Sequence, residues 1–174
     1  MSGDAAAEPG PGAVPNEPAA PPNAEGLAVG ATPVAVVAAH GDLAAGLVSA
    51  VAQITGHGAL LAALSNRGRG AAEIEAELRA LVDSAPVRAV FTDLPGGSCT
   101  MAARRVQRDH PALALATGVN LAALLEFVCA ATAEAGAEPA DAAATVARAL
   151  DRGRASLVAF APPAAASAPG GGAR

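Results

Sequence analysis

The sequence predicts an α/β fold, a three-layer sandwich in which a mostly parallel central sheet lies between two layers of helices. Three observations lead to this prediction. Short apolar runs alternate with longer amphipathic stretches from about residue 33 onward. The short runs are apolar throughout, which is typical of strands covered on both faces. The strand–helix order repeats along the chain, and such repeats fold as right-handed βαβ units with parallel strands.

The first strand–helix–strand unit begins with PVAVVAA at 33–39, a short β-rich run that is followed by a histidine and a glycine. The next segment, 42–55, carries apolar residues at helical spacing, and Asp42 at its start suits the N-cap or first turn. The short apolar run GALLAAL at 58–64 is the second expected strand.

The second unit continues the same alternation. Residues 71–84 are expected to form a helix, because their acids come early and Arg79 comes late, as the helix dipole favours. VRAVFT at 87–92 is the third expected strand, and a tight glycine loop follows it. We expect another helix over 99–110, after that loop.

The remaining elements complete the domain. PALALA at 111–116 is the fourth expected strand. Helices are expected over 120–135, beginning near Asn120, and over 139–153, which has a proline near its start and a glycine at its end. ASLVAF at 155–160 is the final short strand of the prediction.

One folded domain is expected at 32–160, which is the size of an ordinary single domain. Residues 1–31 are dominated by Ala, Pro and Gly, and they carry too little large apolar surface to offset the entropy of ordering. Residues 161–174 have the same character. We therefore expect a disordered arm before the domain and a disordered tail after it.

The composition argues against several classes of protein. The chain is 52% hydrophobic and only 2% aromatic, so its core must be built from Ala, Val and Leu. A net charge of −5 argues against a general nucleic-acid surface, and the arginines at 104, 105 and 108 are interpreted as a solvated helix face. No stretch is apolar for long enough to span a bilayer, and the N-terminus lacks the pattern of a secretory signal.

The two cysteines, Cys99 and Cys129, lie far apart in the sequence and show no spacing typical of zinc ligands. No partner pattern suggests a disulfide between them. We therefore expect a reduced, cytoplasmic protein without a metal site.

Polar residues follow three of the expected strands at their carboxyl ends. His40 follows the first strand, Asp93 follows the third, and Asn120 closes the T-G-V-N stretch after the fourth. Ligand and active sites of open α/β sheets form outside the carboxyl ends of the strands. The predicted topology therefore brings these distant residues to one edge of the sheet.

The chemistry of this edge suits phosphoryl transfer. A carboxylate at Asp93 that accepts a hydrogen bond from one nitrogen of His40 leaves the other nitrogen as a nucleophile. Gly96, Gly97 and Ser98 run into a helix N-terminus, where backbone N–H groups favour an anion. The PGGS loop lacks a following Lys-Ser/Thr and has no G-x-G-x-x-G spacing, so neither ATP nor a dinucleotide is implied.

Each of these residues also has a purely structural interpretation. His40 could be a packing or capping histidine, and Asp93 could merely cap the glycine turn. Ser98 could act only as a helix N-cap. Asn120 is interpreted as an N-cap whose side chain also shapes the rim of the site. We favour the chemical interpretation of His40 and Asp93 because the glycine loop lies in register with them.

Four motifs, in order and at matching spacing, resemble the IIA component of the mannose class in the bacterial phosphoenolpyruvate-dependent sugar phosphotransferase system. AVVAAHGDLA at 35–44 is similar to the family's strand that ends in a phosphoacceptor His-Gly. FTDLPGGS at 91–98 is similar to its Asp-x-x-Gly-Gly-Ser loop. GVNLAALLE at 118–126 resembles its Gly-Val-Asn helix start, and ALDRGRASLVAF at 149–160 resembles its closing helix and strand.

The resemblance implies a phosphocarrier that needs no cofactor. His40 would accept a phosphoryl group from the phosphohistidine of the carrier protein HPr and pass it to a IIB protein or domain. Asp93 would orient His40, and Ser98 with the neighbouring glycine amides would contact the phosphoryl group. The family fold dimerises by exchanging its last strand, which implies a homodimer in which 155–160 pairs antiparallel with the other subunit's sheet.

The chain departs from the family pattern at three places near the expected site. Ala39 stands where the family often has Ser or Thr, and residues 99–101 read CTM where it favours Pro-Phe-Asn. Ala122 replaces a proline. These departures bear on the polar shell of the site and on which partner docks there. The final acceptor could be a sugar transporter made by other chains or a regulatory branch.

Two other function classes remain open at this point. Cys99 lies at an expected helix N-terminus, which lowers the pKa of a thiol, so a Cys-His-Asp site with His40 and Asp93 would make the protein a thiol-dependent enzyme. Alternatively, the folded domain with its Pro-rich arm at 1–31 could be an interaction module that binds a regulator, either without chemistry of its own or in a phosphorylation-dependent way.

Overall fold

The computed structural model describes residues 32–133 and 141–160. The predicted arm at 1–31 and tail at 161–174 lie outside the described residues, as does the segment 134–140.

Strands and helices alternate through the described chain, as the apolar pattern predicts. In chain order the elements are β1 (Ala35–Ala39), α1 (Leu43–Thr55), the 3-10 turn η1 (Gly58–Leu60), β2 (Leu61–Ser65), α2 (Ala71–Ser84), β3 (Ala89–Thr92), α3 (Ser98–Asp109), β4 (Ala114–Thr117), α4 (Leu121–Ala133) and α5 (Ala142–Ala155).

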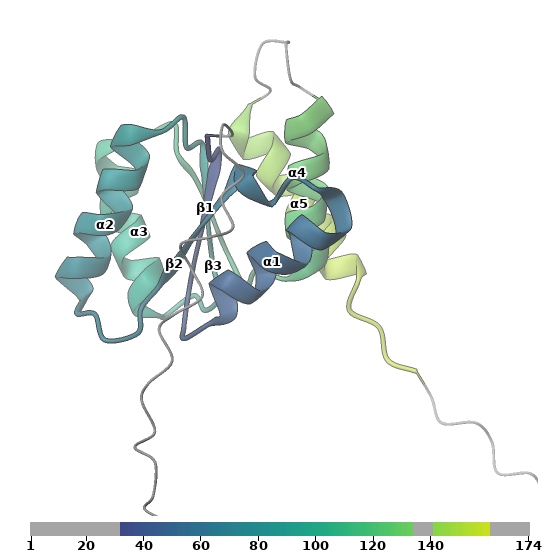
Figure 1. Cartoon of the computed structure of the whole chain (residues 1–174), viewed down its shortest axis with the longest axis horizontal. Coiled ribbons are helices and arrows are strands. Elements are labelled where there is room, and N and C mark those ends of the chain that lie inside the picture. Colours follow the sequence, from purple (N-terminus) through teal and green to yellow (C-terminus); the bar gives the residue numbers. More distant parts are fainter. Residues whose placement is uncertain (1–31, 134–140, 161–174) are drawn as a thin grey trace, which may run out of the picture.

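The strands form one parallel sheet in the order β2-β1-β3-β4. Helices α2 and α3 cover one face of this sheet, and α1, α4 and α5 cover the other (Figure 1). The predicted three-layer α/β sandwich is therefore confirmed.

The central strands are apolar throughout because both of their faces are covered. Every residue of β1 is buried. Val37 and Phe91 point toward α1, α4 and α5, whereas Val36 and Val90 point toward α2 and α3. Phe91 packs against Phe127 on the face covered by α1, α4 and α5. Their ring centroids lie 5.1 Å apart, and the angle between the ring planes is 73°. Such edge-to-face pairs add about 1 kcal/mol beyond the area they bury.

Several element boundaries differ from the prediction by a few residues, and two of them have a local cause. The run at 58–64 begins with a 3-10 turn, so β2 starts only at Leu61. The last helix starts at Ala142, after Asp141, whose carboxylate accepts a hydrogen bond from the N–H of Ala143 at 3.0 Å. A carboxylate at the N-cap satisfies an otherwise unpaired helix N–H, which sets this start.

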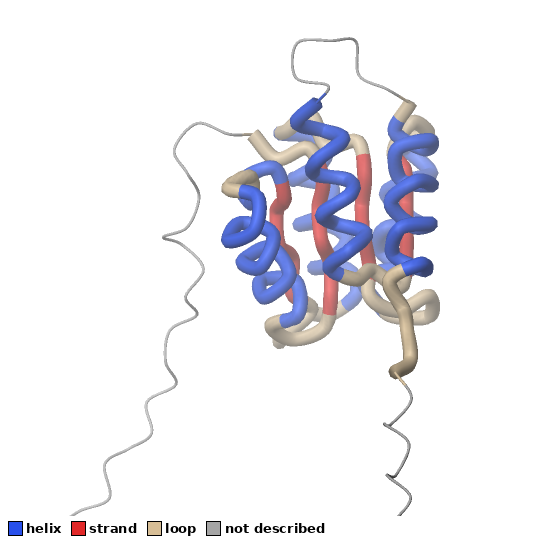
Figure 2. The backbone as a smooth tube through the Cα atoms, turned by 90° about the vertical axis from the view of Figure 1, so that its right-hand side faces the viewer, coloured by secondary structure: helices blue, strands red, loops and turns tan. Residues whose placement is uncertain are grey.

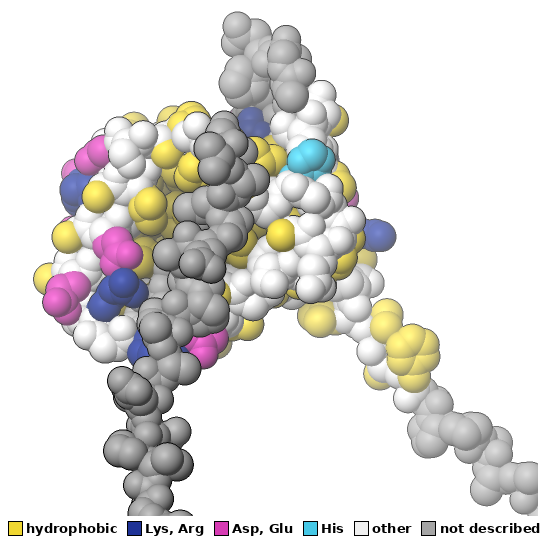
Figure 3. Space-filling view, in the orientation of Figure 1, with side chains coloured by type: hydrophobic (Ala, Val, Ile, Leu, Met, Phe, Trp, Pro, Cys, Tyr) yellow, Lys and Arg dark blue, Asp and Glu magenta, His cyan; other side chains and the backbone are white. Residues whose placement is uncertain are grey.

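The expected strand at 155–160 does not form within the single chain. Helix α5 runs on to Ala155, and the segment after it leaves the domain without pairing to the sheet. Leu157, Val158 and Phe160 are all exposed, and this apolar segment stands out at the lower right of Figure 3. A β-rich run needs a strand to pair with, and pairing with a second copy stays a prediction.

Candidate functional site

The carboxyl ends of the strands gather the predicted site at one edge of the sheet. The loops that follow the strands lie together at the lower end of the molecule in Figure 2. His40 directly follows β1 and Asp93 directly follows β3, which are neighbours in the sheet. Residues 53 positions apart are thereby brought into contact.

His40 and Asp93 are joined by two hydrogen bonds to one carboxylate oxygen. Nδ1 of His40 lies 2.7 Å from Oδ2 of Asp93, and the backbone N–H of His40 donates to the same oxygen at 2.9 Å. The N–H of Leu94 donates to the other oxygen, Oδ1, at 2.9 Å. An ionised carboxylate only accepts, so Nδ1 carries the ring proton and Nε2 keeps its lone pair.

The two side chains differ in their exposure to solvent. The side chain of Asp93 is 9% exposed, whereas that of His40 is 47% exposed. Burial by itself would raise the pKa of Asp93, but the backbone and ring hydrogen bonds from His40, together with the N–H of Leu94, hold that pKa below its usual value. The site thus presents a fixed, ionised carboxylate behind an open imidazole.

The glycine loop packs directly against the imidazole ring. Gly97 is the N-cap of α3 with extended backbone, and a Cβ at this position would lie 3.2 Å from Cε1 of His40. A side chain here would push against the ring, which explains a glycine at this position. A Cβ on Gly96 would meet no atom within 4 Å. Ser98 is the first residue of α3 and not its N-cap, so its predicted capping role is wrong.

A pair of buried threonines, which sequence reasoning missed, holds this loop in place. The hydroxyl of Thr100 donates to the carbonyl oxygen of Leu94 at 2.6 Å. The hydroxyl of Thr92, at the end of β3, lies 2.5 Å from that of Thr100. The two hydroxyls tie the loop to both the strand before it and the helix after it. The T-D-L-P-G-G-S-C-T spacing could have indicated this pair.

The loop after β2 braces the turn that carries His40, a role that sequence reasoning did not predict. The hydroxyl of Ser65 donates to the carbonyl oxygen of Gly41 at 2.6 Å, and Gly41 donates its N–H to Oδ1 of Asn66 at 3.2 Å. The N–H of Asn66 in turn donates to the carbonyl oxygen of Ala39 at 3.1 Å. Gly41 has φ +56°, a conformation that favours glycine. Asp42 makes no capping hydrogen bond to α1.

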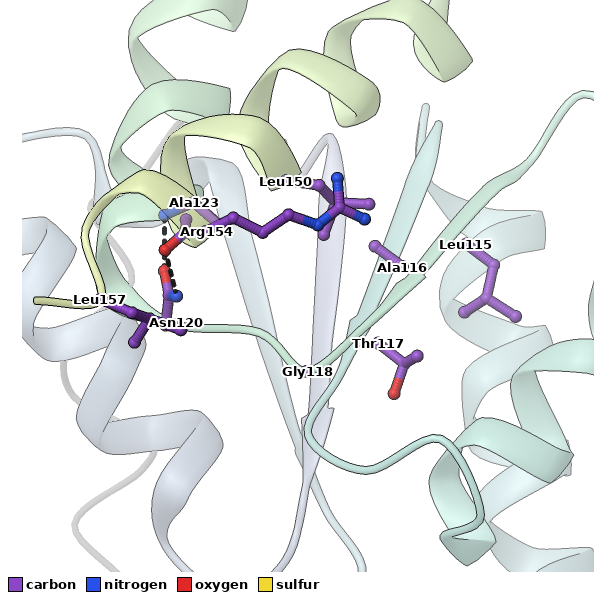
Figure 4. A pocket seen from close by; sticks show the side chains of 10 residues that line it. Leu115, Ala116, Thr117, Gly118, Asn120, Ala123, Leu150, Arg154 and Leu157 are labelled. Atoms are coloured by element: carbon purple, nitrogen blue, oxygen red, sulfur yellow. Dashed lines mark hydrogen bonds between the residues drawn. The ribbon is translucent and has the colours of Figure 1, made fainter.

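Asn120 is the N-cap of α4, as predicted. Its Oδ1 accepts from the N–H of Ala123 at 3.0 Å, and its Nδ2 donates to the carbonyl oxygen of Gly153 at 3.0 Å (Figure 4). These bonds fix the start of α4 to the end of α5. Asn120 also lines a cavity of about 290 Å³ beside β4, with Arg154 and Leu157. Both side-chain hydrogen bonds go to helix ends and not to His40, so a role at the rim of the site stays a prediction.

The environment of Cys99 opposes the thiol-enzyme alternative. Its side chain is fully buried, and burial, followed by the negative charge of Asp93, raises the pKa of its thiol. The expected lowering of this pKa by the helix N-terminus is therefore wrong, because desolvation outweighs the helix dipole. Both Cys99 and Cys129 are free thiols.

Two other features bear on the classes of protein considered. Among the residues that the structure describes, no group of three or more His, Cys, Asp or Glu side chains is arranged to hold a metal ion. Within 32–133 and 141–160, every helix is too short or too polar to cross a membrane.

Known proteins share this fold. The chain superimposes on the phosphotransferase system component EIIA from Streptococcus agalactiae with a TM-score of 0.62 at 21% identity, covering 72% of this chain and 95% of that one. The mannose/sorbose-specific IIA subunit from Enterococcus faecalis gives a TM-score of 0.59 at 22% identity, covering 76% and 97%. The PTS IIA protein associated with the fucose utilization operon of Streptococcus pneumoniae gives 0.60 at 20%, covering 74% and 93%. At these identities the likeness supports the fold alone.

The sequence itself matches a family profile. No curated protein matches the sequence. The profile is described as the PTS system fructose IIA component and matches residues 34–145. This span runs from β1 through α4 to the first turn of α5, and it includes His40 and Asp93. Because it covers more than half of the chain, the chain belongs to the EIIA-man family of phosphotransferase-system IIA components, the family that its motifs resemble.

Proposed function

We propose that this protein is a phosphocarrier that accepts a phosphoryl group on Nε2 of His40 from phospho-HPr and passes it to a IIB component. The observation that carries the proposal is the hydrogen bond of 2.7 Å between Nδ1 of His40 and Asp93. It holds the ring proton on one nitrogen and leaves the other free, on a side chain that is 47% exposed. Membership of the EIIA-man family supports the same conclusion.

The transfer step balances without a cofactor. The lone pair on Nε2 of His40 attacks the phosphorus of the donor's phosphohistidine. The bond between phosphorus and the donor nitrogen breaks, and its electron pair returns to the donor imidazole. The carboxylate of Asp93 offsets the positive charge that develops on the His40 ring. The proton stays on Nδ1 of His40 throughout the step. Delivery to the acceptor repeats the step with His40 as the leaving group.

The N-terminus of α3, beside the His40 ring, supplies hydrogen-bond donors for the phosphoryl group. A Cβ on Gly97 would lie 3.2 Å from Cε1 of His40, so the start of α3, at Ser98, lies close to the imidazole. Backbone N–H groups at a helix start favour a phosphoryl group through hydrogen bonds and the helix dipole. We assign Gly96, Gly97 and Ser98 to phosphoryl binding on this basis.

Exposed apolar side chains supply a docking surface for the protein partners. Leu94 from the glycine loop, Met101 from the first turn of α3 and Leu43 from the start of α1 are all exposed around the strand ends. Apolar side chains ringed by polar groups are typical of protein–protein contacts. Two of the similar solved structures are described as mannose/sorbose-specific and as associated with a fucose utilization operon, which supports a sugar-transport component as the next recipient. A regulatory branch in the cytoplasm is the alternative recipient.

We also propose a homodimer through residues 155–160. Strand β4 is an edge strand, and the cavity of about 290 Å³ beside it is lined by residues of β4, α4 and α5 together with Leu157. The apolar Leu157, Val158 and Phe160 are exposed in the single chain. Light scattering across a concentration series is expected to give the mass of two chains. A monomer at every concentration would reject this part of the proposal.

Phosphorylation with purified components tests the carrier role. The protein is incubated with phosphoenolpyruvate, enzyme I and HPr from the same organism, and intact mass is measured. We expect one acid-labile phosphoryl group on the wild type, none on His40→Ala, and an unchanged group on His57→Ala, since His57 lies at the opposite edge of the sheet. No label on the wild type, or a label that survives in His40→Ala, would reject the proposal.

A further inference from the structure

The loop after β2 is fastened to the phosphoacceptor turn and presents an arginine beside it. A single hydroxyl, that of Ser65, donates to the carbonyl oxygen of Gly41 at 2.6 Å and accepts from the N–H of Arg67 at 3.1 Å. Asn66 forms hydrogen bonds with Ala39 and Gly41, the residues on either side of His40 in the sequence. The backbone of Arg67 therefore has a fixed position relative to the turn at His40.

The side chain of Arg67 lies over the same turn. A Cβ on Gly41 would lie 3.5 Å from Nη2 of Arg67, so the guanidinium lies within van der Waals contact of the position next to His40. Nη2 donates to Oδ2 of Asp42 at 2.9 Å. This ion pair is loose, since Arg67 is 66% and Asp42 is 76% exposed. Exposed pairs of this kind exchange partners at little cost in free energy.

A phosphoryl group changes the charge balance of this turn. It brings close to two negative charges to a place that already holds the carboxylates of Asp93 and Asp42. A guanidinium is well suited to phosphate because it donates several hydrogen bonds in a planar fork. Arg69 of the same loop is held elsewhere, since its Nη1 donates to the carbonyl oxygen of Ser65 at 2.6 Å and its Nε lies 2.9 Å from Glu77.

We propose that Arg67 leaves Asp42 when His40 becomes phosphorylated and binds the oxygens of the phosphoryl group, so that Asp42 and the phosphoryl group compete for one arginine. This inference rests on the proposed phosphocarrier function and adds a phosphoryl-binding side chain to it. Arg67 makes no bond to the reacting nitrogen before transfer. It acts by stabilising the product, which raises the share of phosphoryl groups that the carrier holds.

The equilibrium constant of phosphoryl transfer from phospho-HPr measures this stabilisation directly. Unlike a rate, it does not depend on how well the two proteins dock, because docking speeds both directions equally. Purified phospho-HPr is mixed with the protein, and the phosphorylated fraction of each is read by intact mass at equilibrium. We expect Arg67→Ala to lower the constant about fivefold, as a charge-assisted bond at an exposed site would. Arg67→Lys should retain part of the effect.

Matched variants separate this contact from general electrostatics. Arg69→Ala removes the same charge from the same loop and is expected to leave the constant unchanged. Asp42→Asn frees Arg67 and is expected to raise the constant, but only while Arg67 is present. In Arg67→Ala the substitution of Asp42 should therefore have a much smaller effect, and this non-additivity is the signature of competition.

Each outcome decides the inference. An Arg67→Ala constant equal to that of the wild type would overturn it and leave the phosphocarrier function intact. So would equal effects of Asp42→Asn with and without Arg67, or a loss in Arg69→Ala as large as in Arg67→Ala. An unphosphorylated wild type would overturn the phosphocarrier function, and the inference with it. Thermal unfolding of each variant checks that these exposed substitutions leave the fold unchanged.

Discussion

Replacing Asp93 by Asn tests how the site selects the reactive nitrogen. The carboxylate accepts three hydrogen bonds, two from His40 and one from the N–H of Leu94. An amide has one oxygen, and if that oxygen stays on Leu94 the NH2 group faces both donors of His40. Nδ1 must then accept a hydrogen bond, which moves the ring proton to Nε2 and removes the nucleophile.

The size of the effect follows from the bonds that are lost. A hydrogen bond to a charged group contributes about 2 kcal/mol, so the phosphorylation rate should fall roughly 30-fold. Rapid-quench measurements with phospho-HPr give the rate, and long-range ¹H–¹⁵N spectra of the imidazole give the tautomer. Asp109→Asn, at the other end of α3 and 62% exposed, is the matched control. A wild-type rate in Asp93→Asn, with the proton still on Nδ1, would refute the reasoning.

Replacing Asp93 by Asn is also expected to change how the stability of the fold depends on pH. The fold holds the pKa of Asp93 below the usual value of 3.8, so the ionised carboxylate stabilises the folded state above that pH. The contribution is lost as the pH falls through the lowered pKa. The difference in free energy of unfolding between wild type and Asp93→Asn should thus be largest near neutral pH and shrink below pH 3.8. Urea titrations at several pH values would reveal a constant difference if the carboxylate were unimportant.

Three further substitutions follow from the geometry of the site. Gly97→Ala places a methyl carbon against the imidazole ring of His40 and should slow the proposed phosphorylation about tenfold, whereas Gly46→Ala, which meets open space on α1, should not; equal rates in rapid-quench assays would contradict this. Thr100→Val removes one of the two donors to the carbonyl oxygen of Leu94, which keeps the N–H of Gly97, and should lower the free energy of unfolding by about 1 kcal/mol; unchanged urea midpoints would count against it. Cys99→Ala should still be phosphorylated, and iodoacetamide should modify Cys129 much faster than the buried Cys99 of the native protein; rapid alkylation of Cys99 would restore the thiol-enzyme alternative.

The pairing of His40 with Asp93 could be predicted because topology alone brings them together. Parallel βαβ repeats place every strand's carboxyl end at one edge. In the order β2-β1-β3-β4 the chain runs from β1 to β2 on one side and returns to β3 on the other. The site lies at this reversal, between β1 and β3, which is where open α/β sheets bind their ligands.

Other parts of the site depend on contacts that no local pattern carries. The hydrogen bonds that Gly41 makes with Ser65 and Asn66 join residues 24 and 25 positions apart, and a loop of polar residues gives no sign of its partner. Cys99 shows a competition of two effects, in which the sequence reveals the helix start but not the burial. The segment 155–160 has the composition of a strand, yet strand formation depends on an edge that its own sheet does not give it.

Under the proposed phosphocarrier function, the exposure of His40 has a consequence for the rate at which phosphoryl groups pass through the protein. A partner protein reaches the nitrogen of this half-exposed side chain by covering the strand ends with its own surface. Only one partner can cover that surface at a time. Donor and acceptor must exclude each other, and each delivery requires a dissociation followed by a new encounter. Throughput then depends on encounter rates, so the flow of phosphoryl groups should respond to partner concentration and to ionic strength.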